Sequence, residues 1–215
     1  MPDTNALTYL QLQDAVLGRR FPAAQRANAK RWIQAAYQDV WAAADWTFVR
    51  VSQESLVVAD ATPTMPATFA EALGLWDEQG SKLERLSQEE FEEYAVSPFV
   101  GQPFVYAVVN RQIMVAPTPG GSVTFKLSYK RRLSHKDSDG ITVAAGFMDD
   151  ATDYPLWDDH HSLLIPRAQA IGLNEINDPT GPQQQEEYER QLSRMKDDYE
   201  HVQPQTQWAK TCWDG

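Results

Sequence analysis

The sequence predicts an α+β protein: a helical bundle made from the N- and C-terminal helices, with an inserted antiparallel β region. Apolar residues recur at helical spacing near both chain ends, whereas the middle has short β-branched and aromatic segments separated by turn residues. We therefore expect residues 1–46 and 150–200 to form the helical bundle. Residues 47–149 are expected to form a β-rich insertion with one short helix, and residues 201–215 an extended C-terminal arm.

The first two helices have recognisable start and stop signals. Thr8 and Gln11 have the spacing of a capping box, and Gly18 followed by Pro22 ends the first helix. The second helix is expected from about residue 24 to residue 45. Its apolar stripe consists of Ala29, Ile33, Ala36, Tyr37, Val40, Trp41 and Ala44. The large rings Trp32, Tyr37, Trp41 and Trp46 suit either a core or a contact between subunits.

Strand patterns begin after Trp46 and are interrupted by one helix. Two short strands are predicted at 48–51 and 56–58, and a strand pair at 72–76 and 82–86. Ser87 and Glu90 form a second capping box, which opens a short helix through about Tyr94. Three further segments predict an antiparallel meander, with Asn110–Arg111 as its first turn: 104–109, 112–116 and 123–129.

Helices return after Pro155. The first runs through Trp157 and Ile171 and should kink or split at Pro166, because proline removes a backbone donor. Residues 177–182 break the pattern. The last helix is expected at about 183–200, with a stripe formed by Tyr188, Leu192, Met195 and Tyr199.

The composition bounds the class of protein. Lys and Arg number 19 against 30 Asp and Glu, which gives a formal net charge of −11 and makes the chain a poor general binder of phosphate backbones. The one cysteine, Cys212, allows no intrachain disulfide, and the N-terminus lacks a signal-peptide pattern. No apolar run approaches the roughly 20 residues that span a bilayer. We expect a soluble protein made in the cytoplasm, without membrane contact.

The sequence lacks the glycine-rich nucleotide loops, the zinc-protease and serine-hydrolase motifs and the C-x-x-C motif. We therefore expect a protein that is not an enzyme and needs no cofactor. One acidic and histidine-rich segment, Asp158-Asp159-His160-His161 with Asp149, Asp150 and Asp153 upstream, could hold a metal. Adjacent helical residues diverge by about 100°, however, so only Asp158 and His161 could pair. Helix capping and a solvated face are the favoured interpretation, and His135 and His201 are expected at the surface.

Two segments are candidate interaction sites. Lys130, Arg131 and Arg132, with Lys136, are the main basic run, which is either a solvated loop or a contact for an acidic partner or DNA phosphate. Trp208 and Trp213 lie in an otherwise polar tail. Because tryptophan is a common interface anchor, the tail is expected to dock both rings into another subunit rather than to remain a disordered end.

A family resemblance rests on the order of several short motifs. Residues 30–40, KRWIQAAYQDV, followed by DWTF at 45–48, resemble the second helix of bacteriophage head-to-tail adaptors, where a basic residue precedes W-I-N-x-A-Y-x-D-I and a W-x-F exit. Further segments in the family's order are Met65-Pro66, LSQEEF at 86–91, QPFVYA at 102–107, IMVAPTP at 113–119, YKR at 129–131 and the helices near 156–176 and 187–189. The resemblance covers about residues 8–200. Gln34 replaces a common asparagine, and Pro166 interrupts a helix that is usually smooth.

The resemblance implies a structural virion protein in the neck of the particle, made in the host cytoplasm. Such adaptors form a ring, usually of twelve copies, between the portal protein and the tail or nozzle protein. DNA passes through the ring without sequence-specific binding, on its way between capsid and tail. Two other functions stay open from the residues alone: a carboxylate-dependent hydrolase of cell-wall glycan using Asp149, Asp150, Asp158 and Asp159, and a monomeric ligand-binding module.

Overall fold

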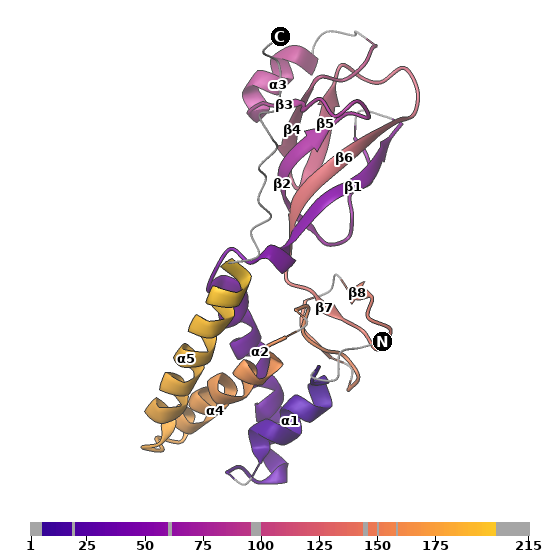
Figure 1. Cartoon of the computed structure of the whole chain (residues 1–215). Coiled ribbons are helices and arrows are strands. Elements are labelled where there is room, and N and C mark those ends of the chain that lie inside the picture. The colour runs from indigo at the N-terminus through magenta and orange to yellow at the C-terminus, as the bar shows by residue number, and fades with distance from the viewer. Residues whose placement is uncertain are drawn as a thin grey trace, which may run out of the picture. The chain divides into compact units, whose positions relative to one another are not determined.

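The computed structural model describes residues 6–18, 20–59, 62–95, 100–143, 146–149, 151–157 and 159–200. The chain is a mixed α+β protein, as the sequence predicts (Figure 1). It divides into two compact units, one formed by Met1–Thr47 with Asp149–Gly215 and the other by Phe48–Met148. We call them the helical unit and the β unit.

The helical unit contains α1 (Tyr9–Leu17), α2 (Arg26–Ala42), α4 (Leu164–Glu175) and α5 (Gly181–Glu200), with 3-10 turns at Ala23–Gln25 and His161–Leu163. Both hydrogen bonds of the predicted capping box are present at the start of α1, which confirms that helix start. Helix α2 ends three residues earlier than expected, and the indole of Trp46 then folds back to donate a hydrogen bond to the Val40 carbonyl, 2.6 Å away.

Helix α4 holds the helical unit together, because α1, α2 and α5 all pack against it. Five of the seven residues in the predicted stripe are buried, whereas Trp41 and Ala44 are only partly buried and Trp32 is buried in addition; the five are Ala29, Ile33, Ala36, Tyr37 and Val40. From α5, Tyr188 and Met195 of the predicted stripe are buried. Gly172 of α4 lies directly against the Trp32 ring, where a Cβ would meet ring carbons at 2.7 Å.

The predicted kink at Pro166 is wrong. Helix α4 begins at Leu164, so Pro166 is its third residue and Trp157 precedes the helix. The first four amides of a helix have no intrahelical acceptor, and a proline there removes no bond from the ladder. The sequence pattern could not show this, because apolar residues before Leu164 continue the helical spacing.

The β unit contains two three-stranded sheets. In the first sheet β6 (Val123–Arg131) lies between β1 (Arg50–Val58) and β2 (Phe69–Trp76) and is antiparallel to both. In the second sheet β4 (Val105–Val109) lies between β3 (Glu84–Arg85), which is parallel to it, and β5 (Gln112–Ala116), which is antiparallel. Two short strands, β7 (His135–Lys136) and β8 (Thr142–Val143), pair separately.

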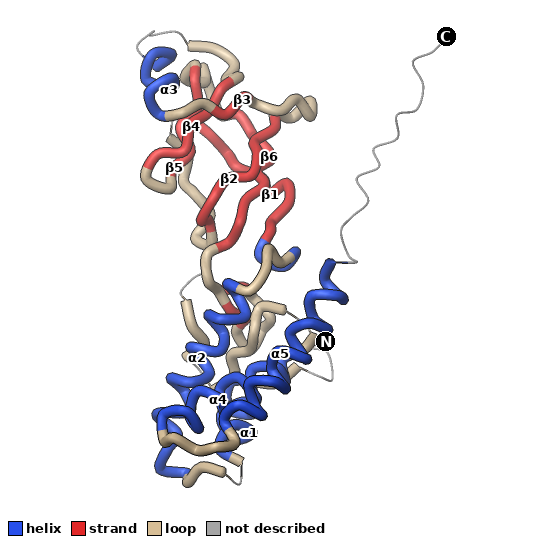
Figure 2. The backbone as a smooth tube through the Cα atoms, turned by 90° about the vertical axis from the view of Figure 1, so that its left-hand side faces the viewer, coloured by secondary structure: helices blue, strands red, loops and turns tan. Residues whose placement is uncertain are grey.

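The two sheets and one helix form layers (Figure 2). The facing sides of the sheets bury one core, to which both central strands contribute large rings: Tyr106 from β4, and Phe125 and Tyr129 from β6. The other side of the β3-β4-β5 sheet is covered by α3 (Gln88–Ala95), whose Phe91 packs on Val105 and Ala107. The second capping box is present, since Ser87 and Glu90 exchange hydrogen bonds at the start of α3. The β3-β4-β5 sheet is therefore buried on both faces, and the β1-β6-β2 sheet on one.

The structure corrects the predicted strand order. The hairpin of β4 and β5 around Asn110–Arg111 is confirmed, but β6 leaves it and joins the other sheet, so the meander is wrong. Strands β4 and β5 are apolar on both sides, whereas β6 alternates and suits a sheet with one solvated face.

Two further strand predictions also change. The two strands expected within 48–58 are a 3-10 turn at Thr47–Val49 followed by the single strand β1. This strand has an extra residue between Val51 and Glu54, where Gln53 adopts φ 54°. The pair expected around Gly80 is reduced to a bridge between Trp76 and Lys82, after which β3 pairs with β4.

Candidate interaction surfaces

The rings of the second helix are part of the helical unit's core. Trp32 is 2% exposed and lies 4.8 Å from Phe21, ring centre to ring centre. Tyr37 stacks on Trp157 at 4.9 Å, and its hydroxyl oxygen accepts a hydrogen bond from the Leu156 amide. Burial raises the pKa of Tyr37 well above its ordinary value, so its hydroxyl stays neutral. These rings therefore stabilise the fold.

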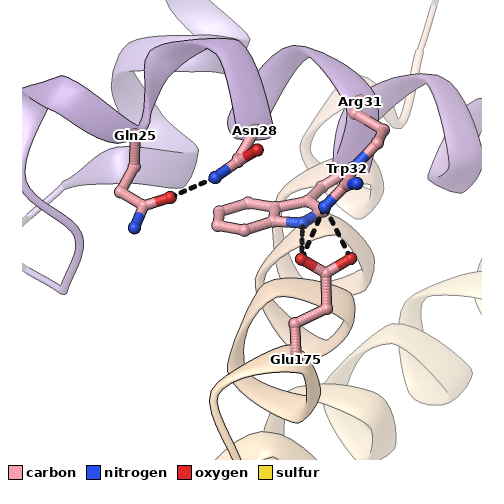
Figure 3. Close-up of polar contacts among 5 residues, drawn as sticks. All are labelled: Gln25, Asn28, Arg31, Trp32 and Glu175. Atoms are coloured by element: carbon pink, nitrogen blue, oxygen red, sulfur yellow. Dashed lines mark hydrogen bonds and ion pairs between the residues drawn. The ribbon is translucent and has the colours of Figure 1, made fainter.

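A polar contact joins α2 to α4 beside that core (Figure 3). The Trp32 indole N–H donates to a carboxylate oxygen of Glu175 at 2.9 Å, and the Arg31 guanidinium donates to both oxygens at 2.9 and 2.7 Å. Glu175 thus satisfies the indole N–H of the buried Trp32 and neutralises the charge of Arg31, both on α2. Nothing in the local sequence predicts this contact, because its partners are far apart along the chain.

The suspected metal cluster does not form within the described residues, where no group of three ligating side chains converges. His161 is buried: its Nδ1 accepts a hydrogen bond from the Leu7 amide at 2.9 Å, and its Nε2 donates to the Trp157 carbonyl at 2.6 Å. Its partner in the metal hypothesis, Asp158, lies outside the described residues, as does Asp150. His161 is therefore a structural histidine with both nitrogens engaged, and its expected solvated position is wrong.

Other members of that segment also serve the fold. Asp153 is 5% exposed and accepts a hydrogen bond from the Asp149 amide, while its own carbonyl accepts one from Tyr9 at the start of α1. His160 has a left-handed backbone and pairs with Asp198 of α5 at 2.8 Å. The surface position expected for His135 is wrong as well, because it is 5% exposed and its Nδ1 lies 3.2 Å from the Gly146 carbonyl oxygen.

The basic run is the end of a strand rather than a loop. Lys130 and Arg131 close β6, and Arg132 follows with its amide bound to the Thr68 carbonyl. Arg131 is partly buried and directs its guanidinium to the Phe48 carbonyl oxygen, 3.5 Å away, whereas Arg132 is exposed. Neighbouring residues on a strand point to opposite faces, so the three cations do not form one patch.

The tail tryptophans Trp208 and Trp213 lie outside the described residues. Their docking into another subunit therefore stays a prediction.

Two outward faces of the β unit were missed by the sequence analysis. The sheet face is the outer side of the β1-β6-β2 sheet, with Trp76, Lys126 and Lys130. The α3 face is the outer side of α3, with four exposed glutamates and the exposed rings of Tyr94 and Phe104. The sequence contained two signals for these faces: the alternation of polar residues in β6 and the run of glutamates at Glu89–Glu93. Only the order of the layers in the structure shows that each set lies on an outward side of the β unit.

The described polar groups of the core hold elements of the fold together, while charged and apolar groups gather on outward faces. The sequence matches the family model described as SU10 adaptor protein over residues 7–209, so the chain belongs to the SU10 adaptor protein family. The resemblance to phage head-to-tail adaptors is thereby confirmed. A comparison with curated protein sequences gave no match. No helix in the described part of the chain is both long and apolar enough to cross a membrane.

Proposed function

We propose that this chain is a head-to-tail adaptor that forms a ring beneath the portal, joins the capsid to the tail and surrounds the passing DNA. The observation that carries the proposal is the family match over residues 7–209. By the same resemblance, twelve copies form the ring, the portal protein lies on one side and a tail or nozzle protein on the other.

The charge of the chain supports a role as a DNA conduit. Each copy has a formal net charge of −11, and a ring repeats that charge around its centre. A channel for DNA should not bind phosphate tightly, because each neutralised phosphate adds affinity and slows passage. We therefore place acidic side chains on the lumen. Reversing several of them to lysine should slow DNA ejection, and unchanged ejection would count against this placement.

The C-terminal arm is the second part of the proposal. Residues 201–215 carry Trp208 and Trp213 among polar residues, and we propose that they anchor the chain to another subunit of the neck. Replacing both tryptophans by alanine should weaken ring assembly. The matched control replaces Gln205 and Gln207, which lie in the same segment, by alanine and should leave assembly unchanged.

The test of the ring uses purified chain and purified portal rings of the same virus. Mass measurement alone and after mixing shows whether copies add to the portal, and electron microscopy of the mixture shows whether they form a closed ring. Saturable addition in a whole-number ratio to the portal subunits supports the proposal. A stable monomer that leaves portal rings unchanged would overturn it.

A further inference from the structure

Two faces of the β unit carry exposed apolar side chains that the described residues leave uncovered. Val57 on the sheet face is 59% exposed, and Tyr94 and Phe104 on the α3 face are 51% and 55% exposed. Large apolar groups gathered on a rigid face, with charges around them, are typical of a protein interface.

The sheet face carries positive charge around an aromatic ring. Lys126 lies on the solvated side of β6 and is the cross-strand neighbour of Trp76. The Trp76 ring covers Gly74, where a Cβ would come within 2.4 Å of it, and Lys82 Nζ lies 5.7 Å from the ring centre. Lys126 donates a hydrogen bond to the Ser55 hydroxyl at 2.7 Å. Neither Lys82 nor Lys126 forms an ion pair with any described residue.

Further cations lie on the same side of the sheet. Lys130 lies on the same side of β6 as Lys126 and faces Arg50 on β1 and Glu71 on β2. The outward side chains of the sheet are thus cationic on balance, in a chain that is acidic as a whole.

The α3 face carries the opposite charge. Phe91 points into the unit, and four exposed glutamates occupy the remaining sides of the helix: Glu89, Glu90, Glu92 and Glu93. The hydrogen bonds of Glu90 and Glu92 are with the neutral side chains of Ser87 and Gln88. Within the described part of the chain, none of the four has a cationic partner at ion-pair distance.

The rings beside these glutamates give the α3 face its apolar part. Tyr94 and Phe104 contact each other edge to face, with ring centres 6.1 Å apart. Phe104 also lines a hollow of about 240 Å³, together with Asp77, Lys82, Leu83 and Pro103, so this hollow lies at the edge where the α3 face adjoins Lys82. A flat indole such as that of Trp76 is a suitable occupant for a surface of this kind.

Helix α3 and the outer side of the β1-β6-β2 sheet lie on opposite sides of one layered unit, because the β3-β4-β5 sheet separates them (Figure 2). The two faces adjoin at one edge, where Lys82 and Phe104 line the same hollow. A closed ring of identical copies requires heterologous contacts, in which one surface of a copy meets a different surface of the next. Two different faces with complementary charge meet that requirement, one with the exposed rings of Tyr94 and Phe104 and the other with the partly exposed ring of Trp76.

We propose that the sheet face of one copy binds the α3 face of the next copy in the ring. Lys82 and Lys126 meet the glutamates of α3, and Trp76 packs against Tyr94 and Phe104. The inference rests on the proposed ring and adds which surfaces form it. A second copy of this chain is the occupant because the two faces of one chain are complementary in charge.

The test reverses charge on one face at a time, with assembly on purified portal rings as the measurement. The sheet-face variant is Lys82→Glu with Lys126→Glu, and the α3-face variant is Glu89→Lys with Glu93→Lys. Each variant alone should need about tenfold more protein for half-maximal ring assembly, because two attractive pairs become repulsive. A control with the charge change of the sheet-face variant, Arg111→Glu with Arg194→Glu, lies outside both faces and should assemble like the wild type.

Mixing the two variants distinguishes this contact from a general charge effect. In an alternating ring every reversed sheet face meets a reversed α3 face, and every native sheet face meets a native α3 face. All contacts then join opposite charges, so an equimolar mixture should assemble within about twofold of the wild-type concentration. Thermal melts establish that each variant is folded. If Lys→Glu variants fail to fold, Lys82→Gln with Lys126→Gln replaces them and should still weaken assembly by a few-fold.

The outcomes separate the two proposals. If each variant assembles rings as efficiently as the wild type, the proposed contact is wrong. The same holds if the mixture assembles no better than either variant alone. Neither outcome contradicts the proposed ring. A wild-type chain that adds no ring to the portal would overturn the proposed function and this contact with it.

Discussion

Gly172→Ala tests the close approach of α2 to α4. In an ordinary helix interior this change stabilises by about 1 kcal/mol, because alanine is the better helix former. At Gly172 the new Cβ would lie 2.7 Å from the Trp32 ring, far inside the usual 3.5–4.0 Å carbon contact. The ring has little freedom to move, since Phe21 packs on it at 4.8 Å and its N–H is bound to Glu175.

Overpacking of a core costs about 1–3 kcal/mol, and a ring held on two sides belongs at the upper end. After the gain in helix propensity, we expect a net loss of about 1–2 kcal/mol in the free energy of unfolding. For a unit of this size that corresponds to a fall in Tm of about 5–10 °C, measured by circular dichroism or calorimetry.

A double-mutant cycle isolates the cause. Trp32→Phe removes the outer ring carbons that the new Cβ would meet, at the cost of the hydrogen bond to Glu175. On the Trp32→Phe background, Gly172→Ala should be neutral or stabilise by up to about 1 kcal/mol. A rise in Tm from Gly172→Ala alone, or the same loss on both backgrounds, would refute the reasoning.

Three further predictions concern the helical unit. Thr8→Ala removes the capping box of α1 and should cost about 1 kcal/mol in urea unfolding, whereas an unchanged midpoint would contradict the cap. Glu175→Gln retains an acceptor for the Trp32 indole and loses only the exposed pair with Arg31, so it should cost less than about 1 kcal/mol. Glu175→Ala leaves the indole unpaired and should cost about 1–3 kcal/mol, and equal losses from both variants would be evidence against this account. Burial, with the charge of Asp149 nearby, raises the pKa of Tyr9 from 10.0 to about 12. The neutral phenol therefore stabilises the fold fully below pH 10 and loses this contribution as the pH rises to 12, so Tyr9→Phe should flatten the fall in Tm over that window.

Local signals predicted the elements well. Thr8 and Ser87 gave correct helix starts because a capping box uses only residues within one turn. Asn110–Arg111 gave a correct hairpin turn, since both residues adopt positive φ there. Each of these signals depends on only a few consecutive residues, so it can be recognised from the sequence alone.

Partners distant along the chain were not predictable. The period of β6 showed that one of its faces is buried, but its position between β1 and β2 depends on partners at least fifty positions earlier. His161 is another case, because its partner Leu7 comes from the opposite end of the chain. A polar residue with a distant buried partner looks the same in sequence as an exposed one.

The position of β6 determines when the chain can fold during its synthesis. Strands β1 and β2 form their sheet hydrogen bonds with β6 and not with each other. Their sheet therefore cannot be completed until the ribosome has added residue 131. Helices α1 and α2 wait longer still, for α4 at Leu164–Glu175. The middle of this protein therefore completes its fold before its beginning does. Because the completed β unit replaces a long flexible loop by a compact body, it also shortens the search by which the two ends of the chain find each other.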